Sequence, residues 1–233
     1  MSMKGEPVTD MPKQIHPESA ARTPSIRMRP DAQTGRGFFF RESLKSLSVT
    51  ASIFPSSRFL ASALLRPIDF DRARIIVELG MGTGAITTEI LRRMAPGSVL
   101  LAIELNPAFI AHVRSKVHDS RFIAISGRAE RLGSILSQKG VRRVDAIVSS
   151  LGLTSMAHDQ RSSIVRQAAE HLGKDGVLTQ FQYLTAGGKP NWARALGLKR
   201  FAEEKFLREY FREVHSERVI WNLPPARVYT CRP

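Results

Sequence analysis

Short apolar runs alternate with stretches of helical periodicity over most of the chain after residue 68. The runs are rich in Val, Ile and Leu and are bounded by turn residues, so they predict buried strands at 74–79, 98–104, 121–126, 144–149 and 177–183. Between them, apolar residues recur at helical spacing, which predicts helices at 85–94, 107–117 and 159–172. Strands that alternate with helices form a parallel sheet covered on both faces, so an α/β fold is expected.

The C-terminal part of the chain departs from this alternation. Residues 191–210 are expected to form a strongly basic helix, and residues 213–221 a sixth strand. After the break at Asn222-Leu223-Pro224-Pro225, residues 227–231 are expected to return as an antiparallel strand. The predicted fold is therefore a Rossmann-like, mostly parallel, seven-stranded sheet with helices on both faces and an antiparallel last strand.

The region before the alternating part divides into two. Residues 1–34 carry five prolines and few large apolar groups, so they are interpreted as a disordered tail. Residues 35–67 are interpreted as an amphipathic, basic helical segment, with Phe40, Leu44 and Leu47 on one helix face and a second helix that carries Phe59, Leu60, Ala63 and Leu64. Two interpretations of 35–67 stay open, a membrane-binding lid over the substrate and ordinary packing on the sheet. Residues 68–233 are expected to form the catalytic domain.

A glycine-rich loop follows the first predicted strand and opens a helix, in the sequence Glu78-Leu-Gly-Met-Gly-Thr-Gly84. Gly80 and Gly82 allow tight backbone turns and close approach of a ligand, and Gly84 is expected to let the helix pack near the strand. Glu104 comes 20 residues after Gly84, at the end of the second strand, where an acid binds ribose hydroxyls. Because Glu78 would attract a sulfonium and an amino group but repel a pyrophosphate, S-adenosylmethionine is favoured over a dinucleotide.

Composition adds a strong positive charge to this picture. Lys and Arg number 35 against 21 Asp and Glu, which gives a net charge of +14 and favours an anionic partner, namely nucleic acid, an anionic membrane surface or an acidic substrate. The single cysteine, Cys231, excludes an intramolecular disulfide and a cysteine zinc cluster, and is interpreted as a passive residue of a terminal strand in a reducing, cytosolic protein. No apolar stretch is long enough to span a bilayer, no signal peptide is evident, and no metal site is expected.

Residues 75–150 resemble the class I S-adenosylmethionine-dependent methyltransferases, on the strength of the glycine loop and its two acids. In that family a Gly-Asp-Ala-like segment beside the adenine usually follows the third strand. Here the segment is Gly127-Arg128-Ala129-Glu130, so that the backbone N–H of Ala129 is expected to serve the adenine in place of an acid. The cofactor-binding residues that the resemblance implies are Glu78, Gly80, Gly82, Gly84, Glu104, Leu105, Arg128, Ala129 and Ser149.

From about Phe38 to the C-terminus, the chain is similar to one subgroup, the bacterial phospholipid N-methyltransferases, which methylate phosphatidylethanolamine. The segments that carry this resemblance are F-F-R-E-S-L-K, P-S-S-R-F-L-A, V-S-S-L-G-L-T-S-M, Q-F-Q-Y and N-L-P-P-A-R-V. It implies methyl transfer to the amine of phosphatidylethanolamine in phosphatidylcholine biosynthesis, by a cytoplasmic enzyme peripheral to the inner face of the cytoplasmic membrane. An ornithine lipid is an alternative substrate.

Methyl transfer to such an amine requires that the ammonium first lose a proton, at a cost of about 4 kcal/mol at pH 7.4. A desolvating pocket lowers this cost, because burial disfavours the charged form. Tyr183, at the end of the fifth strand, is the candidate catalytic residue that orients the amine, and Ser149 and Ser150 are expected to line the pocket. His158 is a candidate base, with a solvated side chain at a helix start as the alternative.

RNA is the second candidate partner, because ribosomal RNA adenine N6-methyltransferases share this fold and a cationic surface. Those enzymes place an Asn-Leu-Pro-Tyr-like turn after the fourth strand, where an aromatic side chain stacks on the flipped base. This chain has Ser149-Ser-Leu-Gly-Leu153 there, without an aromatic side chain. An amino lipid is therefore preferred over RNA as the substrate.

Overall fold

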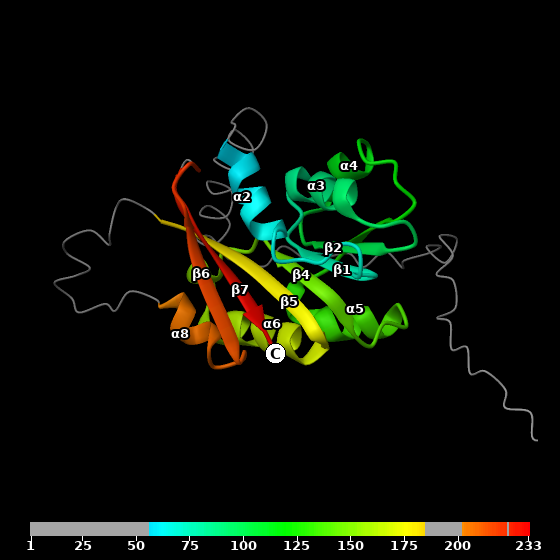
Figure 1. The fold of residues 1–233 in the computed structure, drawn as a ribbon. Helices are drawn as coiled ribbons and strands as arrows, with labels where there is room; N and C mark the ends of the chain where they lie inside the picture. The colour runs from blue at the N-terminus through cyan, green and yellow to red at the C-terminus, as the bar shows by residue number, and fades with distance from the viewer. Residues whose placement is uncertain (1–55, 185–201, 223) are drawn as a thin grey trace, which may run out of the picture.

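The computed structural model describes residues 56–184, 202–222 and 224–233. Seven strands form one sheet in the order β3-β2-β1-β4-β5-β7-β6 (Figure 1). The bounds of the strands are β1 Ile75–Leu79, β2 Val99–Glu104, β3 Phe122–Ser126, β4 Val144–Ser149, β5 Leu172–Tyr183, β6 Glu213–Val219 and β7 Ala226–Arg232. Strands β1 to β5 pair in parallel, whereas β7 is antiparallel to both β5 and β6. The predicted fold class is thereby confirmed.

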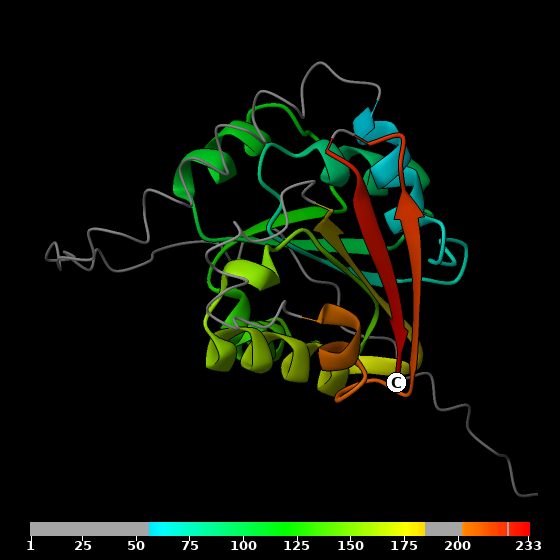
Figure 2. The same cartoon turned by 90° about the vertical axis from the view of Figure 1, so that its left-hand side faces the viewer.

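Helices cover both faces of the sheet (Figures 1 and 2). One face is covered by α5 (Leu132–Gln138), α6 (His158–His171) and α8 (Glu203–Leu207), and the other by α2 (Ser56–Leu65), α3 (Ala85–Arg93) and α4 (Pro107–Arg114). Because side chains alternate along a strand, Val77 and Leu79 of β1 join the cluster under α5 and α6, while Ile76 joins the cluster under α2 and α3. Both faces of the central strands are buried, as expected of a parallel sheet.

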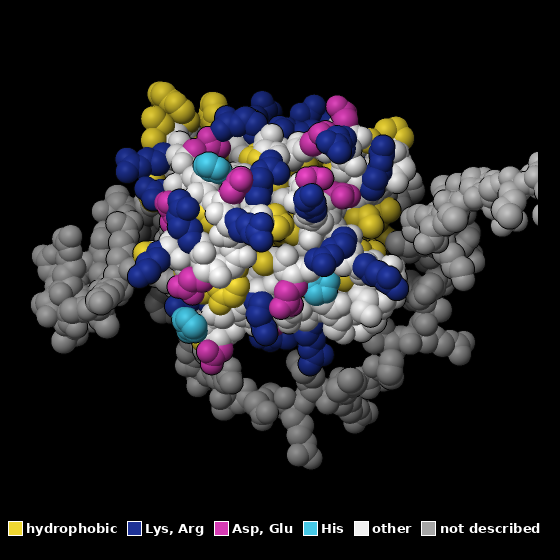
Figure 3. Space-filling view, turned by 60° about the horizontal axis from the view of Figure 1, so that its bottom comes forward, with side chains coloured by type: hydrophobic (Ala, Val, Ile, Leu, Met, Phe, Trp, Pro, Cys, Tyr) yellow, Lys and Arg dark blue, Asp and Glu magenta, His cyan; other side chains and the backbone are white. Residues whose placement is uncertain are grey.

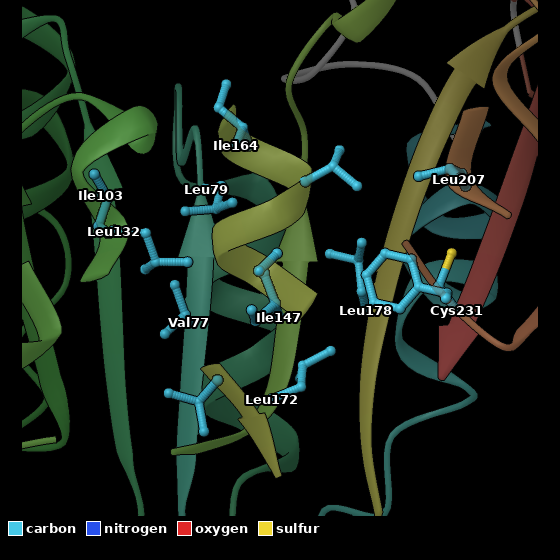
Figure 4. Close-up of a cluster of buried hydrophobic side chains, with 14 of the residues drawn as sticks. Val77, Leu79, Ile103, Leu132, Ile147, Ile164, Leu172, Leu178, Leu207 and Cys231 are labelled. Atoms are coloured by element: carbon cyan, nitrogen blue, oxygen red, sulfur yellow. The ribbon is translucent and has the colours of Figure 1, made fainter. Parts of the chain in front are cut away.

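Figure 4 shows the larger of these clusters, in which Leu178 of β5 and Cys231 of β7 lie near Leu207 of α8. Cys231 is fully buried, and burial raises the pKa of its thiol to about 12. The thiol therefore stays protonated at physiological pH and packs as a small apolar group, as the sequence predicted.

Strand β5 starts earlier than predicted, at Leu172 instead of Val177. Leu172 pairs with Val144 and Val177 pairs with Ala146, so β5 has more residues than β4 between these two pairs. Residues 173–176 therefore bulge out of the ladder. The turn predicted at Lys174-Asp175-Gly176 is thus accommodated as a bulge inside one strand. Helix α5 was not predicted, because Gly133 and Ser134 interrupt its apolar positions.

The predicted basic helix at 191–210 lies mostly outside the described residues; within them, α8 spans only Glu203–Leu207. The expectations for residues 1–34 and for the first part of 35–67 also lie outside the described ranges. The second part of that segment is α2, whose Leu60 and Leu64 are buried against the sheet and whose Phe59 is half exposed. No helix in the described part of the chain is long and apolar enough to cross a membrane.

Candidate functional site

The glycine loop lies at the carboxyl edge of the sheet, meaning the edge at which the parallel strands end. Its backbone is fastened there, because the N–H of Gly80 donates to the carbonyl of Ile103 in β2 at 2.8 Å, and the N–H of Ser150 donates to the carbonyl of Leu79 at 2.9 Å. Gly80, Gly82 and Gly84 all have positive φ angles, of 78°, 52° and 85°. The loop therefore needs glycine for its backbone conformation.

Two of these glycines also lie where a side chain would collide with the protein. A Cβ on Gly80 would lie 2.9 Å from the side chain of Leu151, and one on Gly84 would lie 3.0 Å from Val113 of α4. Gly84 thus allows contact with α4, which differs from the helix–strand contact expected from the sequence. A Cβ on Gly82 would meet nothing within 4 Å, so the backbone at Gly82 borders open space.

Glu104 ends β2 with its carboxylate turned toward the loop. One oxygen accepts from the N–H of Gly82 at 3.1 Å, and the other accepts from the N–H of Asn106 at 2.8 Å. The residue is only 7% exposed, so the carboxylate is held in one place by β2 and by the loop. Each carboxylate oxygen has capacity for a further hydrogen bond, and a ribose hydroxyl is a suitable donor.

Glu78 lies in β1 directly before the loop and is fully buried. Its Oε2 accepts from the hydroxyl of Thr87 in α3 at 2.7 Å, whereas Oε1 has no hydrogen-bond partner among the described residues. Burial raises the pKa of Glu78 to about 7, the Thr87 hydrogen bond opposes the rise, and the negative charge of Glu104 adds to it. Thr87 was not identified from the sequence, although it lies three residues after the last loop glycine.

The residues present fit S-adenosylmethionine. The unpartnered, buried Oε1 of Glu78 offers an acceptor for the amino group of the cofactor, and its negative charge complements the sulfonium. The open space beside Gly82 leaves room for the ligand, and Glu104 supplies the acid for its ribose. The loop and the two acids, predicted from sequence spacing alone, are brought together at one edge of the sheet.

The adenine end of the proposed site lies after β2 and β3. Leu105 follows Glu104 with a side chain that is 52% exposed, and it offers an apolar surface for a purine ring. Ala129 begins a short 3₁₀ helix, Ala129–Arg131, in the loop after β3. The Arg128 side chain pairs with Glu130 at 2.9 Å. The cofactor-binding roles of Leu105, Arg128 and Ala129 stay predictions, as do those of the glycine loop, its two acids and Ser149.

Ser149 ends β4 and Ser150 directly follows it, and both are expected to line the pocket. Ser149 is 3% exposed, and the Ser150 hydroxyl is buried with no partner among the described residues. Gln180 of β5, which the sequence did not single out, donates from its side-chain amide to the carbonyl of Leu151 at 2.8 Å. That hydrogen bond joins β5 to the residue that lies against Gly80.

Tyr183 ends β5 at the same edge, with its ring at 5.0 Å and in edge-to-face contact with that of Phe181. Burial raises the pKa of the phenol, so Tyr183 stays protonated at neutral pH. His158 begins α6 with an exposed side chain, as in the solvated alternative.

Sequence reasoning also missed Glu203 of α8, which is 2% exposed and whose pKa is raised by burial to about 8. No pattern distinguishes this buried acid from its neighbour Glu204.

Comparison with known proteins identifies a methyltransferase domain in the chain. Residues 76–176 match the family model of a methyltransferase domain. An ornithine lipid N-methyltransferase from Singulisphaera acidiphila is 29% identical over 195 residues, which cover 83% of this chain and 94% of that protein. A ribosomal RNA small subunit methyltransferase H from Nitrosomonas europaea is 33% identical over 88 residues, but these cover only 38% of this chain and 27% of that protein.

Solved structures show the same fold at low sequence identity. The 1,6-didemethyltoxoflavin-N1-methyltransferase of Burkholderia thailandensis, solved with S-adenosylhomocysteine, is 18% identical with a TM-score of 0.57 and covers 89% of this chain and 92% of that one. The mitomycin 7-O-methyltransferase MmcR is 16% identical with a TM-score of 0.55 and covers 86% of this chain and 61% of that one. With the glycine loop, its two acids and the matched domain, the chain is an S-adenosylmethionine-dependent methyltransferase.

Proposed function

We propose that this enzyme methylates the primary amine of a membrane amino lipid. The observation that carries the proposal is the extent of the similarity to the ornithine lipid N-methyltransferase, which covers 94% of that protein. It therefore extends well beyond the matched domain at 76–176, into the parts of the chain that accompany the cofactor site. The similarity to ribosomal RNA methyltransferases covers only 27% of the relative, so RNA is the second candidate.

Two amino lipids compete as substrates. Phosphatidylethanolamine follows from the resemblance of the sequence, and ornithine lipid follows from the relative. Both present a primary ammonium on a lipid anchored in a membrane, so the same chemistry serves either. We place the enzyme in the cytoplasm and peripherally on the inner face of the cytoplasmic membrane, where such a headgroup is accessible.

Bound S-adenosylmethionine supplies an electrophilic methyl group on a sulfonium. Glu78 would balance the positive charge of the cofactor from near the end of β1, and Glu104 would hold the ribose from the end of β2. The lipid ammonium would first lose a proton to solvent. The N–C bond would then form as the bond from the methyl group to sulfur breaks and S-adenosylhomocysteine leaves; holding the amine in line makes this transfer effectively unimolecular. Tyr183, protonated and held against Phe181, is proposed to accept a hydrogen bond from the amine and so to orient its lone pair.

The test uses labelled S-adenosylmethionine with four acceptors presented separately. These are phosphatidylglycerol vesicles that contain phosphatidylethanolamine, vesicles that contain ornithine lipid, vesicles of phosphatidylglycerol alone, and small-subunit ribosomal RNA. We expect label in one or both amino lipids and none in the other two acceptors. Label in RNA alone would overturn the proposal. The Glu104→Ala variant is the matched control, because it removes the ribose acid and is expected to abolish transfer to every acceptor.

A further inference from the structure

The hairpin that joins β6 to β7 ends at the same edge of the sheet as the cofactor loop. Since β7 is antiparallel to both β5 and β6, β6 runs parallel to β5. Ala226 pairs with Tyr183 on one side and with Val219 on the other, so these three residues form one row across the carboxyl edge. Residues 220–222, called the hairpin tip below, therefore project beyond the row that contains the candidate catalytic tyrosine.

The hairpin tip exposes two large apolar side chains. Ile220 is 62% exposed and Trp221 is 74% exposed, and only Phe59 at 50% and Leu105 at 52% join them among the exposed large hydrophobic residues of the described chain. Leu105 has a candidate role at the cofactor. Ile220 and Trp221 have no role in the site, and soluble surfaces rarely present adjacent large apolar groups without a partner.

Phe59 extends this apolar surface from α2. Phe59 directly precedes Leu60, and Ile220 directly follows Val219, the last residue of β6; Leu60 and Val219 belong to the same buried cluster. The start of α2 and the hairpin lie side by side in both ribbon views (Figures 1 and 2). The ion pair between Arg66 and Glu217 further joins the end of α2 to β6.

The tip is held in shape from inside. Asn222 is 5% exposed, and its side-chain amide donates to the carbonyl of Pro224 at 2.7 Å. This hydrogen bond braces the turn from below while Trp221 points to solvent. Trp is enriched in the layer between lipid headgroups and acyl chains, so an exposed Trp on a turn held in shape is suited to insert there.

Two exposed arginines lie close in the chain to these apolar residues, Arg58 directly before Phe59 and Arg218 two residues before Ile220. Arg66 at the end of α2 is paired with Glu217, so that pair adds no net charge. On the opposite helical face, which Figure 3 shows, Lys and Arg are spread over the surface and separated by Asp and Glu. Electrostatic attraction to an anionic surface is therefore not confined to the tip. The tip differs in its exposed apolar side chains, whose burial in a membrane would favour insertion there.

We propose that the hairpin tip, together with Phe59, inserts into the headgroup layer of an anionic membrane and brings the amine of a lipid to the carboxyl edge of the sheet. The inference rests on the proposed function, because it names the surface through which that function reaches its substrate. The hairpin tip is a contact that the sequence did not suggest, since the sequence pointed to residues 35–67, which include Phe59, as the membrane-binding segment.

The experiment measures insertion and binding directly. In a Trp192→Phe background, which leaves Trp221 as the only tryptophan, fluorescence is recorded with phosphatidylglycerol–phosphatidylethanolamine vesicles that carry brominated acyl chains. We expect a blue shift and quenching of Trp221, and neither with vesicles of phosphatidylcholine alone. The Ile220→Ser/Trp221→Ser double variant is expected to bind the anionic vesicles about tenfold more weakly or worse. A Trp221→Phe variant is the control and is expected to retain binding.

Cofactor affinity separates this effect from misfolding. The double variant is expected to bind S-adenosylhomocysteine with the wild-type Kd and to methylate a short-chain, monomeric amino lipid at the wild-type rate, while its transfer to vesicles falls. Unchanged vesicle binding by the double variant, or an unquenched Trp221, would overturn the inference. So would a concentration-dependent dimer that the double variant loses, because the tip would then bind a second copy of the chain. If Trp221 inserts but no lipid accepts methyl groups, the proposed function fails and the membrane contact stands.

Discussion

The buried carboxyl group of Glu78 is expected to make cofactor binding depend on pH. Its pKa is about 7 because the side chain is fully buried, and one of its oxygens lacks a partner among the described residues. S-adenosylmethionine brings a sulfonium and an ammonium, both of which favour the ionised acid. Binding therefore lowers the pKa of Glu78 and releases its proton. The affinity for the cofactor is expected to rise with pH through the window around 7.

The size of the effect follows from the fraction of ionised Glu78. With a pKa of about 7, roughly a tenth of the molecules are ionised at pH 6 and roughly nine tenths at pH 8, so the Kd falls about tenfold, or about 1.4 kcal/mol. Isothermal titration calorimetry in two buffers of different ionisation enthalpy measures the released proton. We expect about 0.9 proton at pH 6 and about 0.1 at pH 8.

Two variants isolate this term. Glu78→Gln keeps an acceptor for Thr87 but does not ionise. Its Kd for the cofactor is therefore expected to be higher than that of the wild type at pH 8, and to lack the pH dependence that ionisation of Glu78 causes. Titration of the cofactor's own amine occurs with both proteins and cancels in their ratio. Glu89→Gln is the control, because Glu89 lies in α3, the helix that also carries Thr87, but pairs with Arg92 and Arg93 outside the site. Parallel pH profiles for the wild type and Glu78→Gln would refute the assignment of Glu78 to the charged end of the cofactor.

Three further predictions concern catalysis and stability. Tyr183→Phe keeps the ring against Phe181 but removes the hydroxyl, so kcat/KM for the amino lipid is expected to fall roughly 10- to 100-fold with unchanged cofactor Kd; an unchanged rate leaves Tyr183 a packing residue. Leu64 is fully buried, so Leu64→Ala is expected to lower the free energy of unfolding, measured with urea, by about 2–5 kcal/mol. If α2 served only as a membrane anchor, the substitution would leave that free energy unchanged. Glu203 has a folded pKa of about 8, above its unfolded value, so its contribution to stability is lost as pH rises from about 5 to 8. The free energy of unfolding of Glu203→Gln, relative to that of the wild type, is expected to be roughly 1–3 kcal/mol higher at pH 8 than at pH 5.5. An equal difference at both pH values would contradict the raised pKa.

The sequence predicted the sheet well because its signal is local. β4 was predicted at its observed bounds, Val144–Ser149, and β1, β2 and β3 each start one residue later than expected. Continuous runs of Val, Ile and Leu that are bounded by glycine or aspartate clearly predict strands that are buried on both faces. The bulge at residues 173–176 could not be predicted, because it depends on how far β4 advances beside β5.

For the candidate site, spacing along the chain sufficed to predict which residues of the glycine loop and of the end of β2 lie close together. Glu78, Gly82 and Glu104 come together because parallel strands end at one edge. Thr87 and Gln180 act through contacts that only the fold defines, one under α3 and the other across to Leu151. Likewise, α2 satisfies the amphipathic pattern of a surface helix, yet Leu60 and Leu64 are buried against the sheet. A helical stripe shows which side is apolar without showing what covers it.

The buried position of Cys231 has a practical consequence. It is the only cysteine of the chain, and a thiol sealed in the core does not react with maleimides or nitroxide reagents in the folded state. A cysteine introduced at any exposed position is therefore a unique attachment point without prior removal of the native one. A spin label at position 221 would report immersion depth through its accessibility to oxygen and to polar relaxation agents.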